Sequence, residues 1–472
     1  MKTKTIIGLE IHVEMATDTK MFCSCKNEFG AVPNTNVCPV CLGHPGALPQ
    51  MNEKAVELAV RAGLAFNCDI GNDQKMDRKK YFYPDLVKGY QITQFDKPYA
   101  TNGFIELESG KKIRITEIHM EEDTGKSNHD EKNATLMDYN RSGVPLIEIV
   151  SEPDLSSPDE AREYVETLAS TLRFLGVSDC IMAQGSMRVD VNINLENLDN
   201  GERTAIAEIK NINSIKAIEN ALSYEVERQV NLLKQGDLGV KETRRWDDEK
   251  LETIHMRNKE VGNDYRFSVD GDIPLIELSD EFIENIRKNL PELPKDKEKR
   301  YIDNLKLSQY DANLLANDRE LAKLFEDTNK IVDDPNTCAN WILSELSRRL
   351  NEFEQTPSDM NLSTENFAKL IILAKDNKIN NNVAKKLLRE IYETNEDPQK
   401  IAEGRNLLQI SDSSYLEEIV EEVLKENPES IEDIKAGKDR AFGFLVGQSM
   451  KKTKGKGNPQ EINKLLREKI GE

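Results

Sequence analysis

The stretch from Ile6 to Met15 alternates apolar and polar residues, and it restricts the fold more than any other part of the sequence. Its apolar positions are Ile7, Leu9, Ile11, Val13 and Met15. A period of two predicts a half-buried strand. On the polar face Glu10, His12 and Glu14 follow one another in steps of about 6–7 Å. Solvated strands also carry such rows, so this stretch alone leaves both a plain surface and a functional site open.

The length and net charge of the chain limit the number of domains and the class of protein to which it can belong. The 472 residues are too many for one core, so we expect two to four domains. The chain has 64 Lys and Arg against 85 Asp and Glu, a net charge of −21, which excludes non-specific coating by nucleic acid. Binding of RNA would therefore require local basic patches. The sequence begins without a signal peptide and contains no apolar run of membrane-spanning length, so we expect a cytoplasmic protein.

Four of the seven cysteines form a compact group, Cys23-x-Cys25 followed by Cys38-x-x-Cys41. This spacing is typical of a structural zinc knuckle, and an odd number of cysteines does not suit a disulfide framework. The alternative is four reduced thiols without a metal. A closed four-cysteine site has no open position for water, so the metal would be structural and not catalytic.

Cations and aromatic residues are interleaved from Lys75 to Gln91, an unusual composition for so acidic a chain. Aromatic rings stack on unpaired bases while lysine and arginine contact phosphates. A surface loop with an aromatic anchor explains the composition equally well.

Two further strands carry acidic residues. One runs from Ile113 and ends in His119, Glu121, Glu122 and Asp123. The following Gly125-Lys126-Ser127 is no phosphate-binding loop, because that motif requires glycine where Met120 stands. In the other strand Glu148 is flanked by apolar residues, where an unpaired carboxylate is costly to bury. We expect a cation beside it, most economically a metal shared with the first strand.

Other parts of the chain predict structural elements. Helices are expected at 52–67, from Ser157 to near Gly176, and along the apolar stripe from Ile215 to Leu233. The stretches 187–194 and 205–210 predict strands. Residues that share one face of these strands are Arg188, Asp190, Asn192 and Asn194 in the first, and Glu208 and Lys210 in the second.

Beyond a proline-containing, charged boundary at 291–300 the chain is helical by its spacing of leucine and isoleucine. The segment from Lys438 to Lys456 holds six cations and one anion, which favours a patch for an RNA backbone over a merely soluble tail. The cations are Lys438, Arg440, Lys451, Lys452, Lys454 and Lys456.

Several long motifs resemble the GatB family, the B subunits of tRNA-dependent amidotransferases. The most specific is Asp138-x-Asn140-Arg141-x-Gly143-x-Pro145-Leu-Ile-Glu148-Ile-Val-Ser-x-Pro153. The others are Ile7-Gly-Leu-Glu-Ile-His-Val-Glu14, Tyr81-Phe-Tyr-Pro-Asp85, His119-Met-Glu-Glu-Asp-x-Gly-Lys-Ser127, Asp264-Tyr-Arg-Phe267 and Gly443-Phe-Leu-Val-Gly-Gln448, and the cysteine quartet matches the zinc-carrying members. The resemblance covers the whole chain.

The resemblance implies an α+β, cradle-shaped catalytic domain with a mixed or antiparallel sheet at 1–294, including the zinc knuckle at 23–41. An all-α helical domain at 295–406 and a small helical tail domain at 407–472 that binds tRNA would follow. It also implies a ligase that forms a carbon–nitrogen bond with glutamine as amido donor. Such a subunit phosphorylates the side-chain carboxylate of Glu-tRNA(Gln) or Asp-tRNA(Asn) with ATP, and ammonia from a partner amidase (GatA) displaces the phosphate. A small third subunit (GatC) completes the heterotrimer.

For the site, the resemblance implies that Glu10, His12, Glu122 and Glu148 hold Mg²⁺ and act in catalysis, although histidine is an unusual magnesium ligand. ATP and a structural Zn²⁺ complete the cofactors. Candidates for the phosphates and the acceptor end of the tRNA are Lys79, Tyr81, Tyr83, Lys88 and Tyr90. The remaining cysteines, Cys68, Cys180 and Cys338, lie in no nucleophile motif, so no glutaminase activity is expected from this chain.

Two other hypotheses stay open from sequence alone. One is a tRNA-binding scaffold without catalysis, in which the carboxylates only support the fold. The other is a free-standing ATP-dependent ligase for a small acid, which gives the basic tail no purpose.

Overall fold

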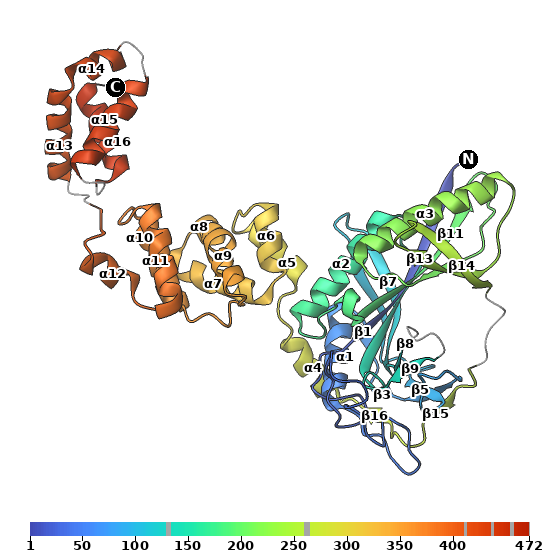
Figure 1. Cartoon of the computed structure of the whole chain (residues 1–472). Coiled ribbons are helices and arrows are strands. Elements are labelled where there is room, and N and C mark those ends of the chain that lie inside the picture. The colour runs from blue at the N-terminus through green and yellow to red at the C-terminus, as the bar shows by residue number, and fades with distance from the viewer. Residues whose placement is uncertain (129–133, 259–264, 410–412, 436–438, 454–456, 472) are drawn as a thin grey trace. The chain divides into compact units, whose positions relative to one another are not determined.

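The computed structural model describes residues 1–128, 134–258, 265–409, 413–435, 439–453 and 457–471. It divides the chain into two compact units, Met1–Leu293 and Pro294–Glu472, which we treat separately (Figure 1). Within the described residues no helix is both long enough and apolar enough to cross a membrane.

A nine-stranded sheet organises the described part of the first unit, in the order β14-β13-β12-β11-β1-β10-β7-β6-β2. Its strands are β1 (Thr3–Glu14), β2 (Asp69–Ile70), β6 (Ala100–Glu106), β7 (Lys112–Glu122), β10 (Pro145–Ser151), β11 (Met187–Asn197), β12 (Ala207–Lys210), β13 (Glu242–Asp247) and β14 (Glu252–Asn258). All neighbours are antiparallel except β12 and β13, which are parallel, so the sheet is mixed.

Helices cover one face of this sheet and form the main core with it (Figure 1). They are α1 (Glu53–Ala65), α2 (Pro158–Phe174) and α3 (Ile215–Lys234), and α4 (Asp280–Lys288) packs on α1. Leu9 and Ile11 of β1 are fully buried in the same cluster as Leu168 of α2 and Ile218 of α3. Because successive strand residues point to opposite faces, Glu10 and His12 lie on the face that these helices leave uncovered.

Smaller elements add to the first unit. A three-stranded sheet contains β4 (Asp77–Lys80), β5 (Tyr90–Thr93) and β15 (Ser268–Val269). Two further pairs are β3 (Asp73–Gln74) with β16 (Ile276–Glu277), and β8 (Lys126–Asn128) with β9 (Leu136–Asp138), and a short turn of 3₁₀ helix spans Met182–Gln184.

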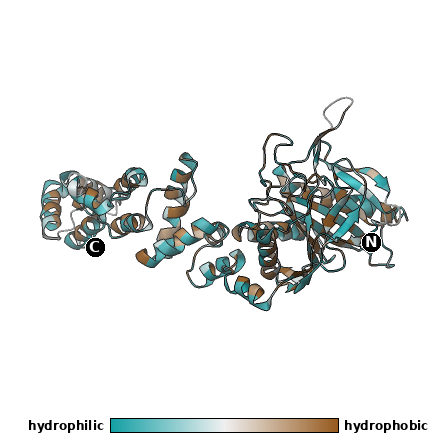
Figure 2. Ribbon diagram, turned by 90° about the horizontal axis from the view of Figure 1, so that it is seen from below, coloured by the Kyte–Doolittle hydropathy of each residue, from teal (hydrophilic) through white to brown (hydrophobic). Residues whose placement is uncertain are grey.

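The second unit is helical throughout its described residues. The helices are α5 (Pro294–Asp303), α6 (Gln309–Ala316), α7 (Arg319–Val332), α8 (Pro335–Asn340), a π-helix (Trp341–Leu346), α9 (Ser347–Glu352), α10 (Thr364–Lys375), α11 (Asn381–Thr394), α12 (Pro398–Gly404), α13 (Ser413–Glu426), α14 (Pro428–Lys435), α15 (Asp439–Lys452) and α16 (Pro459–Ile470). Figure 2 shows hydrophobic and hydrophilic residues mixed along these helices, as expected for amphipathic helices. Their buried residues form two clusters, one from Tyr301 to Ala402 and one from Leu416 to Ile470.

The expected fold class is confirmed, because a mixed sheet with helices is followed by a helical region. The expected division of the helical region at residue 406 remains a prediction.

Candidate functional site

Four strands bring polar side chains together on the uncovered face of the large sheet. His12 of β1 stands opposite Glu148 of β10 on one side and opposite Arg188 of β11 on the other. Glu148 in turn stands opposite His119 of β7. Strand register therefore assembles residues that are more than 100 positions apart in the sequence.

His12, Glu121 and Glu148 converge, with one ligand atom from each within 4.8 Å of the other two. The Nδ1 atom of His12 lies 3.2 Å from Oε1 of Glu121 and 3.9 Å from Oε2 of Glu148. His119 supports the group from behind, with its Nε2 atom 2.9 Å from Oε2 of Glu148. Two carboxylates and an imidazole at these distances can hold a divalent cation.

The histidines set the charge of Glu148, whose side chain is only 13% exposed. Burial alone would raise the pKa of Glu148, but the hydrogen bond from His119 and the nearby charges of His12, His119 and Lys79 lower it to about 2. Burial would likewise lower the pKa of His119, yet its bonds to Glu117 and Glu148 raise it to about 10. The carboxylate of Glu148 is therefore ionised at neutral pH and able to bind a cation.

A second acidic group, Glu10, Asp190 and Glu208, lies beside the first. Glu10 is two positions before His12 on the same face of β1, and it stands opposite Asp190 of β11. Asn192 donates a hydrogen bond of 2.9 Å to Glu10, and Lys210 lies 2.5 Å from Asp190. Burial, followed by the charge of Glu148, raises the pKa of Glu10. Three carboxylates within 4.8 Å form an all-oxygen ligand set.

The structure corrects the expected position of Glu122. This residue does not join Glu10 and Glu148; it accepts hydrogen bonds from Lys88 and from the backbone N–H of Ile92 (3.0 Å), while its neighbour Glu121 faces the site. The reason is an irregularity in β7, where the pairing register with β10 shifts between Val150 and Ser151. The shift reverses the alternation, so that Met120 is buried in the core and Glu122 faces the same side of β7, where it meets Lys88, β5 and the cysteine loops.

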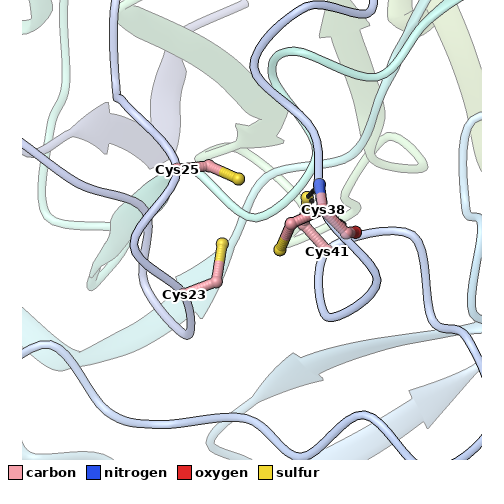
Figure 3. Close-up of side chains that lie close together, drawn as sticks. All are labelled: Cys23, Cys25, Cys38 and Cys41. Carbon is pink, nitrogen blue, oxygen red and sulfur yellow. Dashed lines mark hydrogen bonds between the residues drawn. The ribbon is translucent and has the colours of Figure 1, made fainter.

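The four cysteines of the expected knuckle lie together, and Figure 3 shows their sulfur atoms converging from two loops. All four Sγ atoms are within 4.8 Å of one another. The backbone N–H of Cys38 donates to Sγ of Cys41 (3.1 Å), and the Nζ atom of the fully buried Lys20 lies 3.7 Å from the same sulfur. A hydrogen bond from Cys23 lowers the pKa of the Cys41 thiol to about 4. The donor set and its cationic neighbour fit a tetrahedral, thiolate-bound metal.

The candidate lysines and tyrosines separate into two places. Lys79 and Tyr81 lie near the acidic face. The charge of Lys79 helps to lower the pKa of Glu148, and the charge of Glu121 helps to raise the pKa of Tyr81. Lys79 also lies over the ring of Tyr265 at 5.0 Å, and Tyr81 donates to Gln91 (3.3 Å).

Lys88 and Tyr90 instead line a cavity of about 210 Å³ together with Glu122 and residues of the cysteine loops. The ring of Tyr90 is covered by the Arg78 guanidinium at 4.5 Å, so this face of the ring is not free to stack on a base. Tyr83 is 65% exposed, and its neighbour Phe82, which the sequence analysis did not select, is 83% exposed.

The tail retains part of the expected basic patch. Arg440 and Lys451 on α15 are exposed. Lys452, in contrast, is paired with Glu422 (2.9 Å) and Glu426 (2.6 Å). The remaining cations of the patch, Lys438, Lys454 and Lys456, lie outside the described residues.

Sequence reasoning did not select several residues that complete the acidic face, namely His119, Glu121, Asp190, Glu208, Lys210 and Arg188. The signal for the last four was present in the alternation of polar residues at 188–194 and at 208–210, and His119 and Glu121 lie in the acidic strand that begins at Ile113. Only the order of strands, which brings β11 and β12 next to β1, gives that alternation a meaning.

Comparisons with known proteins agree along the whole chain. A family model described as the GatB/GatE catalytic domain matches residues 5–284, and one described as the GatB domain matches residues 323–470. A protein of Finegoldia magna is 58% identical over 473 residues that cover all of both chains. Proteins of Thermoanaerobacter pseudethanolicus (47%, all of both chains) and Clostridium tetani (46%, all of this chain and 99% of the relative) are also similar. All three are named as the B subunit of an aspartyl/glutamyl-tRNA(Asn/Gln) amidotransferase.

Proposed function

We propose a reaction for this chain from the premise that it belongs to the GatB family, since two family models match most of its length and its relatives align with it from end to end. The resemblance found in the sequence is thereby confirmed. The chain is accordingly one component of a tRNA-dependent amidotransferase, a ligase that forms a carbon–nitrogen bond. We further propose that it activates the side-chain carboxylate of Glu-tRNA(Gln), Asp-tRNA(Asn) or both at the expense of ATP.

The chemistry requires activation because a carboxylate has no good leaving group. A carboxylate oxygen attacks the γ-phosphorus of ATP, the bond from that phosphorus to the β–γ bridging oxygen breaks, and ADP leaves. Ammonia then attacks the acyl carbon, phosphate leaves, and the amide loses a proton to the leaving phosphate. Phosphoryl transfer depends mainly on positioning and on neutralising charge, which is what a face rich in paired ionic groups can provide.

The observation that carries this proposal is the convergence of His12, Glu121 and Glu148 beside Glu10, Asp190 and Glu208. We propose that these two sets hold Mg²⁺ or a similar divalent ion. When bound, such an ion neutralises phosphate charge and polarises the phosphoryl oxygens. The all-oxygen set suits Mg²⁺, whereas the set containing His12 also suits Mn²⁺.

A cavity of about 320 Å³ adjoins the acidic sets and supports a site for the nucleoside of ATP. Gly8 and Glu10 lie in its wall, Asn192 and Asn194 offer amide groups, and Lys241 offers a cation. Its apolar residues are Ile6, Leu9, Val150, Pro153 and Ile206. Apolar walls with a few convergent polar groups are typical of small-molecule sites. A nucleotide here would direct its phosphates along β1 toward Glu10 and His12.

We propose that Cys23, Cys25, Cys38 and Cys41 bind Zn²⁺ in a structural role. All four thiolates would be occupied as ligands, which leaves no position for a reacting water. The buried ammonium of Lys20 offsets part of the negative charge of such a site.

We propose that glutamine hydrolysis is the task of a partner amidase (GatA), with a small third protein (GatC), because relatives that are named as a B subunit imply other components. Cys68, Cys180 and Cys338 are buried, and burial raises the pKa of each thiol. None is therefore poised as a nucleophile. Translation uses aminoacyl-tRNA in the cytoplasm, where we place the reaction.

For the tRNA, we propose that the acceptor end approaches the acidic face near Lys79, Tyr81 and the exposed Tyr83. Lys88 and Tyr90 would act at the neighbouring cavity, and Glu122 would act there through Lys88 and not as a metal ligand. Arg440 and Lys451 would contact the tRNA body from the tail, whose domain we propose to span 407–472. Lys452, with two glutamates beside it, would contribute less.

Replacement of Glu148 tests the proposal against a purely scaffolding role. In the full complex, Glu148→Gln should abolish ATP consumption that depends on misacylated tRNA, while binding of deacylated tRNA stays at the wild-type level. The matched control is Glu196→Gln, which alters a glutamate of the same sheet that pairs with Arg203 (2.9 Å) at the edge of β11. Wild-type turnover in Glu148→Gln would refute catalysis on this face.

A further inference from the structure

Arg188 lies on the polar face of the sheet, and the reaction proposed above gives it no role. It stands opposite His12 in β11, at the end of a row that runs from Asn194 through Asn192 and Asp190. Along β1 the same row passes from the cavity beside Gly8, past Glu10, to His12. Gly8 and His12 are about 13 Å apart at the rise of a strand. A nucleotide that enters from the cavity would therefore end its phosphate chain beside Arg188.

Within the described residues the guanidinium of Arg188 pairs with Asp123, and the charges of Glu14 and Glu121 lie nearby, but one of its N–H donors is unused. Its Nη2 atom lies 3.0 Å from Oδ1 of Asp123, while its Nε atom is buried and has no hydrogen-bond partner there. A guanidinium has five N–H donors in a planar fork, and a buried donor without a partner costs about 1–3 kcal/mol. The side chain is 39% exposed, so a ligand can reach its outer end.

Asp123 does not depend on Arg188 alone. Its carboxylate also accepts from the backbone N–H of Thr124 (2.8 Å), and the Nε atom of Arg141 lies 3.3 Å away. Arg141 is fixed by the carbonyl oxygens of Thr124 and Gly125, each at 3.0 Å. A second cation therefore remains with Asp123 when the guanidinium of Arg188 turns toward a ligand.

We propose that Arg188 binds and orients the side-chain carboxylate of the misacylated amino acid, an inference that rests on the function proposed above. A guanidinium fork matches the two oxygens of a carboxylate, whereas an ammonium does not. One oxygen keeps a free lone pair for attack on the γ-phosphorus, so the bond changes are those already given and no proton moves in this step. Lys79, which lies close to Glu148, would remain available to bind the phosphates of ATP.

The proposal also accounts for discrimination against the product. After amidation the substrate carries an NH₂ group where one carboxylate oxygen stood. That group is a donor and would face the donors of Arg188, so the amidated tRNA loses hydrogen bonds that the acidic substrate makes. Sites built for a particular hydrogen-bonding group reject analogues that lack it.

The experiment compares Arg188→Ala, Arg188→Lys and the matched control Arg203→Ala in the full complex. Arg203 also pairs with one carboxylate, that of Glu196, but it is 60% exposed and lies near the end of β11, away from the polar face around His12. The first measurement is the ratio of dissociation constants for Glu-tRNA(Gln) and Gln-tRNA(Gln), with the aspartate and asparagine pair in parallel. We expect a preference for the acidic form in the wild type, its loss in Arg188→Ala, its partial recovery in Arg188→Lys, and no change in Arg203→Ala.

The second measurement is ATP consumption that depends on misacylated tRNA. Arg188→Ala should lower kcat about 100-fold, as loss of a charge-stabilising donor typically does, with little change in KM for ATP. If Arg188→Ala raised KM for ATP but kept the preference for the acidic tRNA, Arg188 would bind the phosphates of ATP and the proposal would be overturned. Unchanged discrimination and kcat would also overturn it.

Two controls separate other failures. Circular dichroism and binding of deacylated tRNA report whether Arg188→Ala is folded; if it is not, Arg188→Lys carries the test of discrimination. A wild-type complex that binds both tRNAs but never consumes ATP would refute the proposed function, while the ratio of dissociation constants would still decide the role of Arg188.

Discussion

The ionic groups on the sheet face of the first unit contrast with the exposed ion pairs on the helices of the second. On the sheet face of the first unit, ionic groups from distant strands are buried together, as with Glu148 and His119 at 2.9 Å. In the second unit many ion pairs lie on helix surfaces, such as Lys330 with Asp327 (2.8 Å), whose side chains are 72% and 39% exposed. Exposed pairs contribute about 0–1 kcal/mol each, whereas buried charges are costly unless fully paired. Charge on the sheet face is therefore kept at a cost that a binding or catalytic role would explain, whereas the exposed pairs on the helices contribute little to stability.

The largest expected effect comes from two adjacent glutamates that face opposite sides of β7. Glu121→Gln removes a carboxylate from the set that contains His12, so affinity for Mn²⁺ should fall at least as much as the 10–100-fold typical of changes to groups that support metal ligands. Glu122→Gln should leave that affinity near the wild-type value, because Glu122 is paired with Lys88.

Titration calorimetry or Mn²⁺ electron paramagnetic resonance measures both variants. Equal loss of affinity in Glu121→Gln and Glu122→Gln would contradict the faces assigned to β7.

The next effect is confined to one unit. Cys41→Ser should reduce bound zinc, measured by elemental analysis, and should weaken protection from hydrogen exchange in the cysteine loops and the strands beside them. Exchange in α7 and α10 should not change.

Cys338→Ala is the matched control, because that buried thiol lies in the core of the second unit. It should speed exchange in the helices around it and leave the zinc content unchanged. Folded, active protein with no zinc in either sample would argue against the metal.

A smaller effect is expected in the tail. Replacement of both Arg440 and Lys451 with alanine should weaken tRNA binding several-fold and reduce the salt dependence, since each lost phosphate contact lowers the slope of log K against log salt by somewhat less than one. Lys452→Ala should matter less, because Glu422 and Glu426 already neutralise that lysine. Filter binding across a salt series measures the slopes, and a larger effect for Lys452→Ala would contradict this order.

The smallest effect concerns acid stability of the second unit. Burial would raise the pKa of Glu326, but bonds from Lys297 (2.8 Å), Arg300 (2.6 Å) and Tyr301 (2.9 Å) lower it. A lowered pKa means that the ionised group stabilises the fold above its unfolded pKa of about 4.3, and that this contribution is lost as pH falls through the folded value.

Glu326→Gln should therefore reduce the free energy of unfolding at neutral pH and flatten its decline between about pH 5 and the folded pKa. Denaturant unfolding at several pH values measures both quantities. Parallel pH profiles for the variant and the wild type would show that the carboxylate contributes nothing.

The sequence was sufficient where local pattern decides structure. The alternation at 6–15 predicted β1 and its polar face, and the cap at Ser157 predicted the start of α2, where its hydroxyl accepts from the N–H of Glu160 (3.1 Å). The cysteine spacing predicted a group that the structure brings together.

Features that depend on pairing between strands were harder to predict from the sequence. Counting in twos from Ile113 puts Glu122 on the polar face, but the register shift opposite Val150 and Ser151 places Glu121 there. Nor does the sequence place β12 two strands from β1, which is what joins Glu208 to Glu10. Long-range register, and not local propensity, determines the membership of the site.

Gly143 connects the cysteine loops to the reaction face. It adopts a left-handed backbone (φ +85°), donates to the carbonyl of Asp123 (2.9 Å) and accepts from the N–H of Met21 (2.8 Å). A Cβ atom there would lie 3.6 Å from Cys41 and 3.8 Å from the carboxylate of Glu122. A side chain at Gly143 would therefore strain the one residue whose backbone bonds both Met21, beside the cysteine loops, and Asp123, the ion-pair partner of Arg188.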